Sequence, residues 1–224
     1  MGLWIKRLRQ GGGSGGVTEG SVRFELDHLA VVARSLEEGC AWVEARLGAG
    51  RLRPGGRHAR YGTHNALMAL GEGCYLEVIA PDPEAPAPGR PRWFALDHVA
   101  GAPRLANWIL RVEGIEAARE ALPCDPGPAV ALARDALRWR ITVPEDGSLP
   151  LGGGCPTLIE WDPGTPPPGT VLPASGCTLG SLDVRCPEAA ALAAALGPVP
   201  GVTLETGPLA LSARIATPQG EVVL

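Results

Sequence analysis

Aromatic residues and lysine are scarce in this chain of 224 residues. Aromatic side chains make up 4% of it, and Lys6 is the one lysine among 20 basic residues. The basic residues are outnumbered by 24 Asp and Glu, and no basic stripe is interleaved with aromatics, so we expect no nucleic-acid partner. No apolar run reaches the roughly 18 residues that a membrane-spanning helix needs, so we expect no membrane span.

The chain also lacks any Cys-x-x-C pair, which argues against a zinc knuckle or a thioredoxin-type redox site. Its six cysteines are scattered through a chain long enough to bury a core without covalent cross-links. We therefore expect free thiols in a reducing cytosol and a cytoplasmic protein. The cysteines are Cys40, Cys74, Cys124, Cys155, Cys177 and Cys186.

Glycine and proline, by contrast, are abundant, with 31 and 23 residues. Most of them cluster between periodic segments, as expected for turns and connectors. The N-terminal stretch differs from the rest, because it combines the short cationic "LWIKRL" with the linker-like "GGGSGG". It lacks the apolar region and the cleavage site of a signal peptide. We interpret residues 1–21 as a flexible leader or an artificial tail, and residues 22–224 as the folded domain.

A βαβββ order of elements begins after this leader. The segment "FELDHLAVVA" (24–33) is an apolar run of strand length, rich in β-branched residues. Ser35, with Glu38 three residues later, matches a capping box, and apolar residues at helical spacing follow. The period then falls to two, which predicts strands in "THNALMALG" (63–71) and "CYLEVIAPD" (74–82).

The same order of elements recurs twice more along the chain. A second pass begins with the strand "LANWILRV" (105–112), and a weaker third pass begins with "TLGSLDVRC" (178–186). Repetition at this spacing indicates a repeated supersecondary unit. We therefore predict an α+β fold of repeated βαβββ modules, two clear and a third weaker, whose curved mixed sheets surround a cleft. The modules span about 24–80, 105–162 and 177–224.

One βαβββ module cannot cover both faces of its own sheet. Its helix shields one face and leaves the concave face open, so two modules side by side would enclose a cleft. Side chains alternate along a strand, so every second residue points into that cleft. A polar residue at such a position needs a partner, because an unpaired buried charge is costly.

Three such polar residues stand in strands of the first two modules. His28 lies in the first strand of module one, while Glu77 and Glu160 lie in the closing strands of modules one and two. Imidazole and carboxylate groups in one cleft suit a divalent cation such as Zn²⁺, Ni²⁺, Mn²⁺ or Fe²⁺. The competing interpretation is structural, with His28 bonded to a backbone carbonyl and Glu77 paired with an arginine. Aligning the helix starts places Asn107 opposite His28 in module two.

Further candidates lie in two loop-flanked segments. His64 begins the strand "HNALMAL" and is a candidate third ligand or acid–base group, and Asn65 is a candidate substrate contact. In a regular strand these two neighbours face opposite ways. We interpret His58 as a loop residue in solvent. In "GRPRWFALDH", Arg92 and Trp93 are candidates to hold an acidic or carbonyl substrate, although the loop could equally tuck its aromatics into the core.

The segments "LDHLAVVARSLEEGCAWVEARLG", "GTHNALM", "YLEVIAPDP", "RPRWF" and "LIEWD" together resemble the vicinal oxygen chelate superfamily, in particular its glyoxalase-like branch. The resemblance covers residues 24 to about 162 and extends more weakly into the third module. It implies paired modules around a cleft, with a metal held by a His or Gln on a first strand and a Glu on a closing strand. In this chain those positions are His28 and Glu77, with Glu160 at the corresponding place in module two. Asn107 departs from the pattern.

Two functions follow as hypotheses. The first is a metal-dependent enzyme of lyase, isomerase or dioxygenase type acting on a small oxygen-rich substrate, with His28 and Glu77 holding the ion and Glu160 and His64 as catalytic groups. The second is a protein that encloses a small molecule without chemistry. We expect a small-molecule ligand and no nucleotide cofactor in both cases, and a homodimer is compatible with either. The second hypothesis places the ligand between Trp93, Trp108, Trp139 and Trp161.

Overall fold

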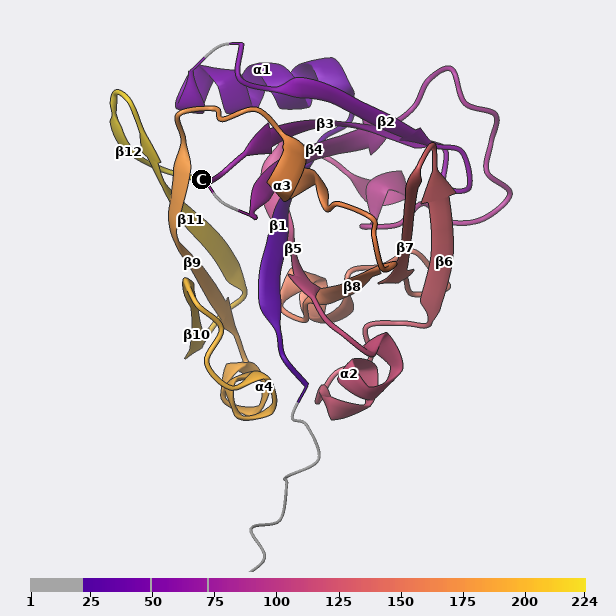
Figure 1. The fold of residues 1–224 in the computed structure, drawn as a ribbon, viewed down its shortest axis with the longest axis vertical. Helices are drawn as coiled ribbons and strands as arrows, with labels where there is room; N and C mark the ends of the chain where they lie inside the picture. Colours follow the sequence, from indigo (N-terminus) through magenta and orange to yellow (C-terminus); the bar gives the residue numbers. More distant parts are fainter. Residues whose placement is uncertain (1–21, 49, 72) are drawn as a thin grey trace, which may run out of the picture.

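The computed structural model describes residues 22–48, 50–71 and 73–224 (Figure 1). The proposed leader, residues 1–21, lies outside the described residues. The chain forms a mixed α+β fold with two sheets, one of eight strands and one of four. This architecture confirms the predicted fold class.

The first module follows the predicted βαβββ order. It consists of β1 (Glu25–Val32), α1 (Leu36–Leu47), β2 (Arg53–His58), β3 (Thr63–Ala69) and β4 (Tyr75–Pro81). Ser35 caps α1 as predicted, because its hydroxyl oxygen accepts a hydrogen bond of 3.1 Å from the N–H of Glu38. Strand β2 lies in "RPGGRH", a segment whose Pro and Gly favour a turn. It is an end strand of the sheet, where a proline is tolerated.

The rest of the chain repeats this order along the sequence. The second module consists of β5 (Arg104–Arg111), α2 (Ile115–Ala121), β6 (Ala129–Arg134), β7 (Leu137–Thr142) and β8 (Thr157–Trp161). The third unit consists of β9 (Thr178–Cys186), α4 (Ala189–Leu196), β10 (Val202–Thr206), β11 (Ala210–Thr217) and β12 (Gly220–Val223). Short helical turns η1 (Leu96–His98), η2 (Pro150–Gly153) and α3 (Pro168–Val171) lie in the connectors. Among the described residues, no helix has the length and apolar character needed to cross a membrane.

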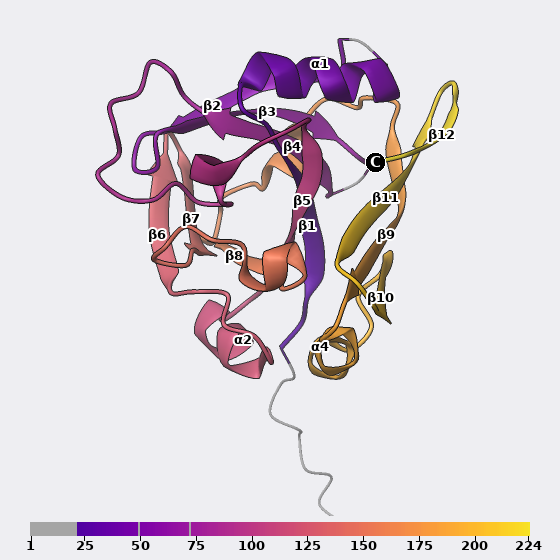
Figure 2. The ribbon, with the colours of Figure 1, turned by 180° about the vertical axis from the view of Figure 1, so that it is seen from behind.

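The eight-stranded sheet joins the first two modules edge to edge. Its strand order is β2-β3-β4-β1-β5-β8-β7-β6, with β1 parallel to β4 and antiparallel to β5. The sheet curls until its two end strands approach each other, since the side chain of Arg134 in β6 lies against Gly56 in β2. Helices α1 and α2 lie outside this curved sheet (Figure 1, Figure 2). The concave faces of the two modules therefore enclose a common interior.

The third unit has the same order along the chain but a different sheet topology. Its strand order is β10-β9-β11-β12, so the first strand lies between its second and third strands. In modules one and two the first strand pairs with the fourth instead. The four-stranded sheet packs on the outer face of the β1–β5 seam, where Leu29 and Trp108 share one core with Leu182 and Ile215. The third unit thus covers the seam and contributes no wall to the interior.

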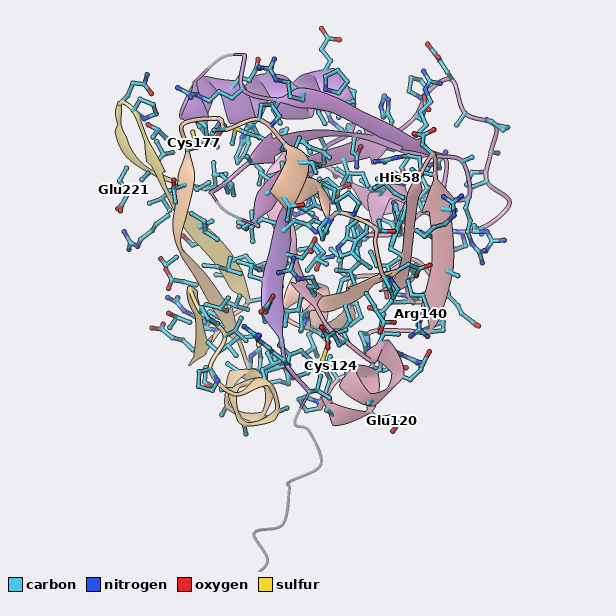
Figure 3. All side chains as sticks on the ribbon, in the orientation of Figure 1. His58, Glu120, Cys124, Arg140, Cys177 and Glu221 are labelled. Carbon is cyan, nitrogen blue, oxygen red and sulfur yellow. A yellow bond between two sulfur atoms is a disulfide. The ribbon has the colours of Figure 1, made fainter. Side chains whose placement is uncertain are left out.

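The prediction of free thiols is wrong for two of the six cysteines. Cys124, which follows α2, forms a disulfide with Cys155, which precedes β8 (Figure 3). Helix α2 packs on β8, and this packing brings together two cysteines that are 31 residues apart in sequence. Among the described residues the other four cysteines are free thiols.

Candidate active site

A cleft of about 40 Å³ lies inside the curved eight-stranded sheet. Its wall is mainly aromatic and aliphatic, and a few polar side chains reach it from several strands. The polar lining residues are His28, His58, Asn65, Glu77 and Arg134, and the aromatic ones are Tyr75, Trp93, Phe94, Trp139 and Trp161. This volume holds only a small group, so a larger ligand requires the wall to move. A mainly apolar cleft with a few convergent polar groups is typical of a small-molecule site.

A β-bulge in β1 places two consecutive polar residues side by side. The pairing of β1 with β5 shifts between Leu26 and His28, so Asp27 is the extra residue of the bulge. In a regular strand Asp27 would point away from His28, but here its Oδ1 lies 2.7 Å from His28 Nδ1. The indole N–H of Trp161 donates to Asp27 Oδ2 at 3.0 Å. Asp27 is fully buried, and it fixes the orientation of the imidazole.

His28 and Glu77 face each other in the cleft. His28 Nε2 lies 3.6 Å from Glu77 Oε2, and both side chains are buried. Burial acts to lower the pKa of His28, but its contacts with Asp27 and Glu77 outweigh burial and raise that pKa to about 9. Burial acts to raise the pKa of Glu77, but His28, His58 and Asn65 outweigh it and lower that pKa. At neutral pH the pair therefore consists of an imidazolium and a carboxylate.

Asn65 holds the carboxylate of Glu77 in place. Its Nδ2 donates to Glu77 Oε1 at 2.5 Å, and its Oδ1 accepts from the N–H of Gly56 at 2.7 Å. Asn65 Nδ2 also lies 3.2 Å from His58 Nε2. Burial lowers the pKa of His58 to about 4, so this imidazole is neutral at neutral pH. The structure thus gathers the predicted His28, Glu77 and Asn65 around one point.

The interpretation of His58 as a loop residue in solvent is wrong, because His58 lines the cleft. It is the last residue of β2 and lies where β2 approaches β7 (Figure 3). Its ring meets that of Trp93 edge-on, with 5.0 Å between ring centroids, and that of Trp139 at 6.3 Å. This position could not be predicted, because the segment that ends in His58 is rich in turn-forming residues.

Trp93 and Arg92 separate at the rim of the cleft. Trp93 is buried in the wall, where its Nε1–H donates to Thr63 Oγ1 at 3.0 Å. Arg92 turns away and pairs with Asp97, with 2.6 Å between Nη1 and Oδ1, while its Nε–H donates to the carbonyl of Gly62. Trp93 therefore forms part of the cleft wall, and Arg92 fastens the loop that carries it.

Two further candidates, His64 and Glu160, lie on the outer face of the sheet. His64 Nδ1 is 4.0 Å from Asp82 Oδ1 and does not reach the cleft. Glu160 accepts from the N–H of Gly114 at 2.6 Å and pairs with Arg140, which lies near α2 (Figure 3). Neither is near enough to His28 and Glu77 to share a substrate with them.

The two modules show why Glu160 does not correspond to Glu77. The N–H of Ala33 donates to Ile79 in module one, and the N–H of Val112 donates to Ile159 in module two. Ile159 is therefore the equivalent of Ile79. Two residues earlier along each strand, Thr157 is the equivalent of Glu77, and Glu160 is not. An alignment on the two glutamates is therefore shifted by three residues, and an odd shift along a strand reverses the face on which a side chain lies.

Module two carries neutral residues where module one carries charged ones. The same count makes Asn107 the equivalent of His28 in module two. The alignment of the helix starts predicted this equivalence. The pairing of β1 with β5 shifts a second time between Ala30 and Val31, where Ala106 is the extra residue of β5. Ala106 is therefore the equivalent of Asp27 in module two. Asn107 Nδ2 donates to Thr157 Oγ1 at 2.8 Å, and both residues are buried. Module two therefore has an amide–hydroxyl pair in place of the imidazole–carboxylate pair of module one.

These donors do not fit the metal site that the resemblance implies. A zinc site takes three or four ligands from Cys, His, Asp or Glu, but at the matching position module two offers only the amide and the hydroxyl bonded to each other. Within the part of the chain that the structure describes, no three or more His, Cys, Asp or Glu side chains are grouped to hold a metal ion. The metal site remains a prediction from the resemblance.

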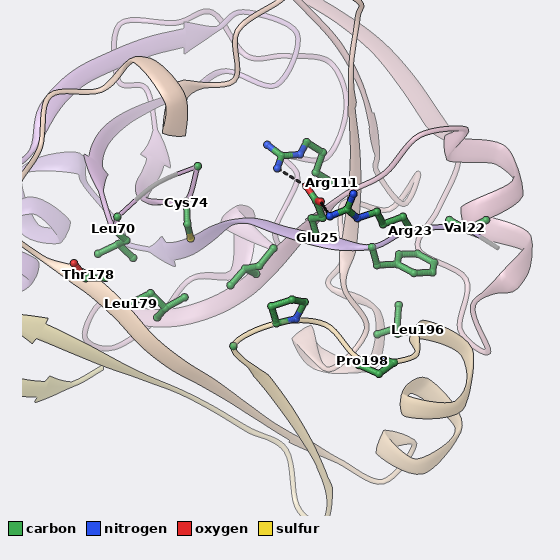
Figure 4. Close-up of a pocket in the computed structure, with 16 residues that line it drawn as sticks. Val22, Arg23, Glu25, Leu70, Cys74, Arg111, Thr178, Leu179, Leu196 and Pro198 are labelled. Carbon is green, nitrogen blue, oxygen red and sulfur yellow. Dashed lines mark hydrogen bonds and ion pairs between the residues drawn. The ribbon is translucent and has the colours of Figure 1, made fainter. Parts of the chain in front are cut away.

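A second cavity, of about 800 Å³, lies between the start of β1 and the third unit (Figure 4). Its charged groups are paired, since Arg111 Nη2 lies 2.6 Å from Glu25 Oε2. Burial raises the pKa of the Cys74 thiol in its wall to about 12, which keeps that sulfur protonated and unreactive. Among the described residues, the buried imidazole and carboxylate groups with shifted pKa values, His28, His58 and Glu77, therefore lie in the interior cleft.

A family model supports the resemblance seen in the sequence. The model described as "Glyoxalase-like domain" matches residues 26–199, which include both modules and α4. No curated protein sequence matches the chain.

Three solved structures are similar to the chain at low identity. A hypothetical protein from Staphylococcus aureus gives a TM-score of 0.49 and 15% identity, over 75% of this chain and 71% of that chain. Methylmalonyl-CoA epimerase from Mycobacterium tuberculosis gives 0.38 and 20%, over 61% and 85%. A variant of Streptomyces coelicolor methylmalonyl-CoA epimerase in complex with 2-nitronate-propionyl-CoA gives 0.41 and 12%, over 66% and 100%. All three scores are below 0.5, so the family assignment rests on the sequence match.

Proposed function

The chain belongs to the glyoxalase-like domain family, and we propose that it is an enzyme that transfers a proton at a carbon next to a carbonyl group, as isomerases and lyases do. The observation that carries this proposal is the buried arrangement of Asp27, His28 and Glu77 inside an aromatic cleft. An acid and a base held next to each other, with their pKa values moved apart by their surroundings, are the usual components of such chemistry.

Each polar residue has a distinct role in this proposal. His28, kept protonated by Asp27, donates a hydrogen bond from Nε2 to the carbonyl oxygen of the substrate. Glu77, oriented by Asn65, removes the proton from the neighbouring carbon. The separation of 3.6 Å between His28 Nε2 and Glu77 Oε2 is longer than a strong charge-assisted hydrogen bond, so the pair can open to admit an oxygen atom.

The chemical step is a balanced proton transfer. The C–H bond breaks, its proton moves to Glu77, and its electron pair forms the carbon–carbon double bond of an enolate. The negative charge that develops on the oxygen is stabilised by the N–H of His28. In an isomerase Glu77 returns the proton to the substrate, and in a lyase a group on the next carbon leaves with its bonding electrons.

Substrate binding makes Glu77 a stronger base. In the free cleft, contact with His28 is the main effect that lowers the pKa of Glu77, while burial opposes it. When the carbonyl oxygen takes the N–H of His28, that contact weakens and burial dominates. The pKa of Glu77 then rises toward the range in which a carboxylate removes protons efficiently.

Deuterium exchange tests this proposal directly. The protein is incubated in D₂O with a panel of small ketones and oxo acids, and NMR follows the loss of hydrogen from carbons next to the carbonyl. We expect exchange that slows about 100- to 10,000-fold in Glu77→Gln. Glu120→Gln, which removes an exposed carboxylate on α2, serves as the matched control and keeps the wild-type rate.

Deuterium exchange measured after removal of metal ions separates this proposal from the metal-dependent alternative. The expected result is that exchange persists after dialysis against a chelator, because no step above uses a metal. If exchange disappears and returns with Zn²⁺, Ni²⁺, Mn²⁺ or Fe²⁺, the metal-dependent enzyme is the correct interpretation. Elemental analysis of chelator-free protein and of Glu77→Ala gives a second readout.

Binding without chemistry is the second candidate function. It is favoured by the aromatic wall, in which Trp93, Trp139 and Trp161 surround the polar groups. Trp108, the fourth tryptophan of that hypothesis, lies on the outer face of the sheet and contributes nothing to the cleft. Tryptophan quenching by a compound that shows no exchange at any pH would support sequestration over catalysis.

A further inference from the structure

Arg134 projects into the cleft from the strand opposite His28 and Glu77. It is the last residue of β6, and its pairing partner Leu137 lines the cleft together with Trp139 and Ile141. Residues directly opposite each other in an antiparallel pair lie on the same face. Val130 and Leu132, the preceding residues of β6 on that face, pack against the aromatic wall, so the apolar row ends in a guanidinium.

No acidic group neutralises this guanidinium within the described residues. Arg134 is partly buried, and the structure gives it neither a hydrogen bond nor an ion pair. Each of the other partly buried arginines of the described chain donates to a carboxylate or to a backbone carbonyl. These are Arg51, Arg92, Arg111, Arg119 and Arg140.

The path of the side chain is set by a glycine on the opposite end strand. Arg134 lies across Gly56, and a Cβ at that position would collide with the arginine side chain. The N–H of Gly56 donates to Asn65, which in turn holds Glu77. The guanidinium is also close enough to His58 to contribute to the lowered pKa of that imidazole, after burial. Arg134 therefore lies beside the residues that hold the acid–base pair, and it carries the opposite charge to Glu77.

We propose that Arg134 is the anion-binding residue of the cleft, and that the ligand is a small carbonyl compound that carries a carboxylate. A guanidinium presents two parallel N–H groups that match the two oxygens of a carboxylate. A carboxylate held by Arg134 would keep its charge away from Glu77 and direct the carbonyl end toward His28. The carboxylate subsite stands on the geometry of Arg134 alone, and the carbonyl group rests on the proposed function.

Binding of matched acids and esters tests the subsite without any need for turnover. The probes are 2-oxobutanoate, 4-oxopentanoate and 5-oxohexanoate, which vary the spacing between carbonyl and carboxylate, each beside its uncharged methyl ester. Quenching of tryptophan fluorescence reports affinity. We expect at least one acid to bind more tightly than its ester, and Arg134→Gln to weaken that acid about 10- to 100-fold while leaving the ester unchanged.

Two further variants make the result specific. Arg138→Gln removes an exposed arginine of β7 that bonds only to the backbone of its own turn, and it should leave the affinity for the acid unchanged. Arg134→Lys keeps the charge but loses the paired N–H groups, and it should fall between wild type and Arg134→Gln. Circular dichroism confirms that each variant is folded.

The outcomes separate this inference from the proposed function. Equal affinity for acid and ester in the wild type, equal losses for both in Arg134→Gln, or no binding of any acid would overturn the carboxylate subsite. If the esters alone show Glu77-dependent exchange, the subsite is wrong and the proton transfer stands. If an acid binds through Arg134 but never exchanges, the subsite stands and the proton transfer is wrong.

Discussion

At the scale of single residues, the chemistry of the cleft depends on the bulge at Asp27. The bulge sets a carboxylate beside His28 where a regular strand would send it to the opposite face. His28 and Glu77 could be predicted, because each is a polar residue in a strand whose other residues are mostly apolar. Asp27 could not, because a bulge leaves no periodic mark in the sequence. The position of Arg134 in the cleft could not be predicted for a related reason, since no sequence pattern indicates that the curvature of the sheet brings β6 close to β2.

The raised pKa of His28 predicts how stability depends on pH. An unfolded chain loses the histidine proton near pH 6.5, whereas the folded protein keeps it until about pH 9. Between these values the folded state binds more protons, so the free energy of unfolding falls as pH rises. We expect a loss of up to about 3 kcal/mol across this window, measured by urea unfolding at several pH values.

The comparison that isolates His28 uses two asparagine variants. His28→Asn should flatten the fall in stability between pH 6.5 and pH 9, whatever its stability at a single pH. His98→Asn, at an exposed histidine, should keep the wild-type slope. Identical slopes in wild type and His28→Asn would mean that the Asp27–His28 contact does not hold the proton.

At the scale of elements, the short helix α3 closes one side of the cleft. Pro168 at its start lines the cleft, and Gly169 packs on the backbone of the β3–β4 turn. Sequence periodicity predicted most helices and strands, because their apolar residues recur at helical or strand spacing. It gave no indication of α3, which lies in a proline-rich connector with no period.

Replacing Gly169 by alanine should loosen this closure. A Cβ at Gly169 would lie 2.6 Å from the carbonyl carbon of Gly73, so α3 has to move outward. We expect a loss of about 1 to 3 kcal/mol in stability and easier quenching of the cleft tryptophans by acrylamide. Val171→Ala, at a residue of α3 that is 62% exposed, should change neither. Unchanged quenching in Gly169→Ala would show that α3 does not control access.

At the scale of the whole molecule, the third unit completes the core of the paired modules. The fold class and the repeated order of elements could be predicted, because periodicity and turn residues mark each unit. The different strand order of the third sheet could not, since pairing depends on contacts between distant segments. The Cys124–Cys155 disulfide escaped prediction in the same way, as the packing of α2 on β8 creates it.

Removal of the third unit should therefore unfold the paired modules. A chain that ends at residue 174 would expose the outer face of the seam, where Leu29 and Trp108 have no exposed surface in the intact protein. We expect such a chain to aggregate or to lose its cooperative thermal transition, as seen by size-exclusion chromatography and near-UV circular dichroism. Val223→Asp in the full chain, at an exposed residue of β12, should keep the transition. A monomeric truncated chain with a sharp transition would contradict this.

The difference between the two modules, of which only the first has a carboxylate in the cleft among the described residues, has a stereochemical consequence. A planar enolate in the cleft would have the Glu77 carboxylate on one side, and module two offers no second carboxylate at the matching position, where Thr157 is bonded to Asn107. A single base can return a proton only to the face from which it took one. Such a site would distinguish the two hydrogens of a methylene group and preserve handedness at a substituted carbon, since racemisation needs a proton donor on each face.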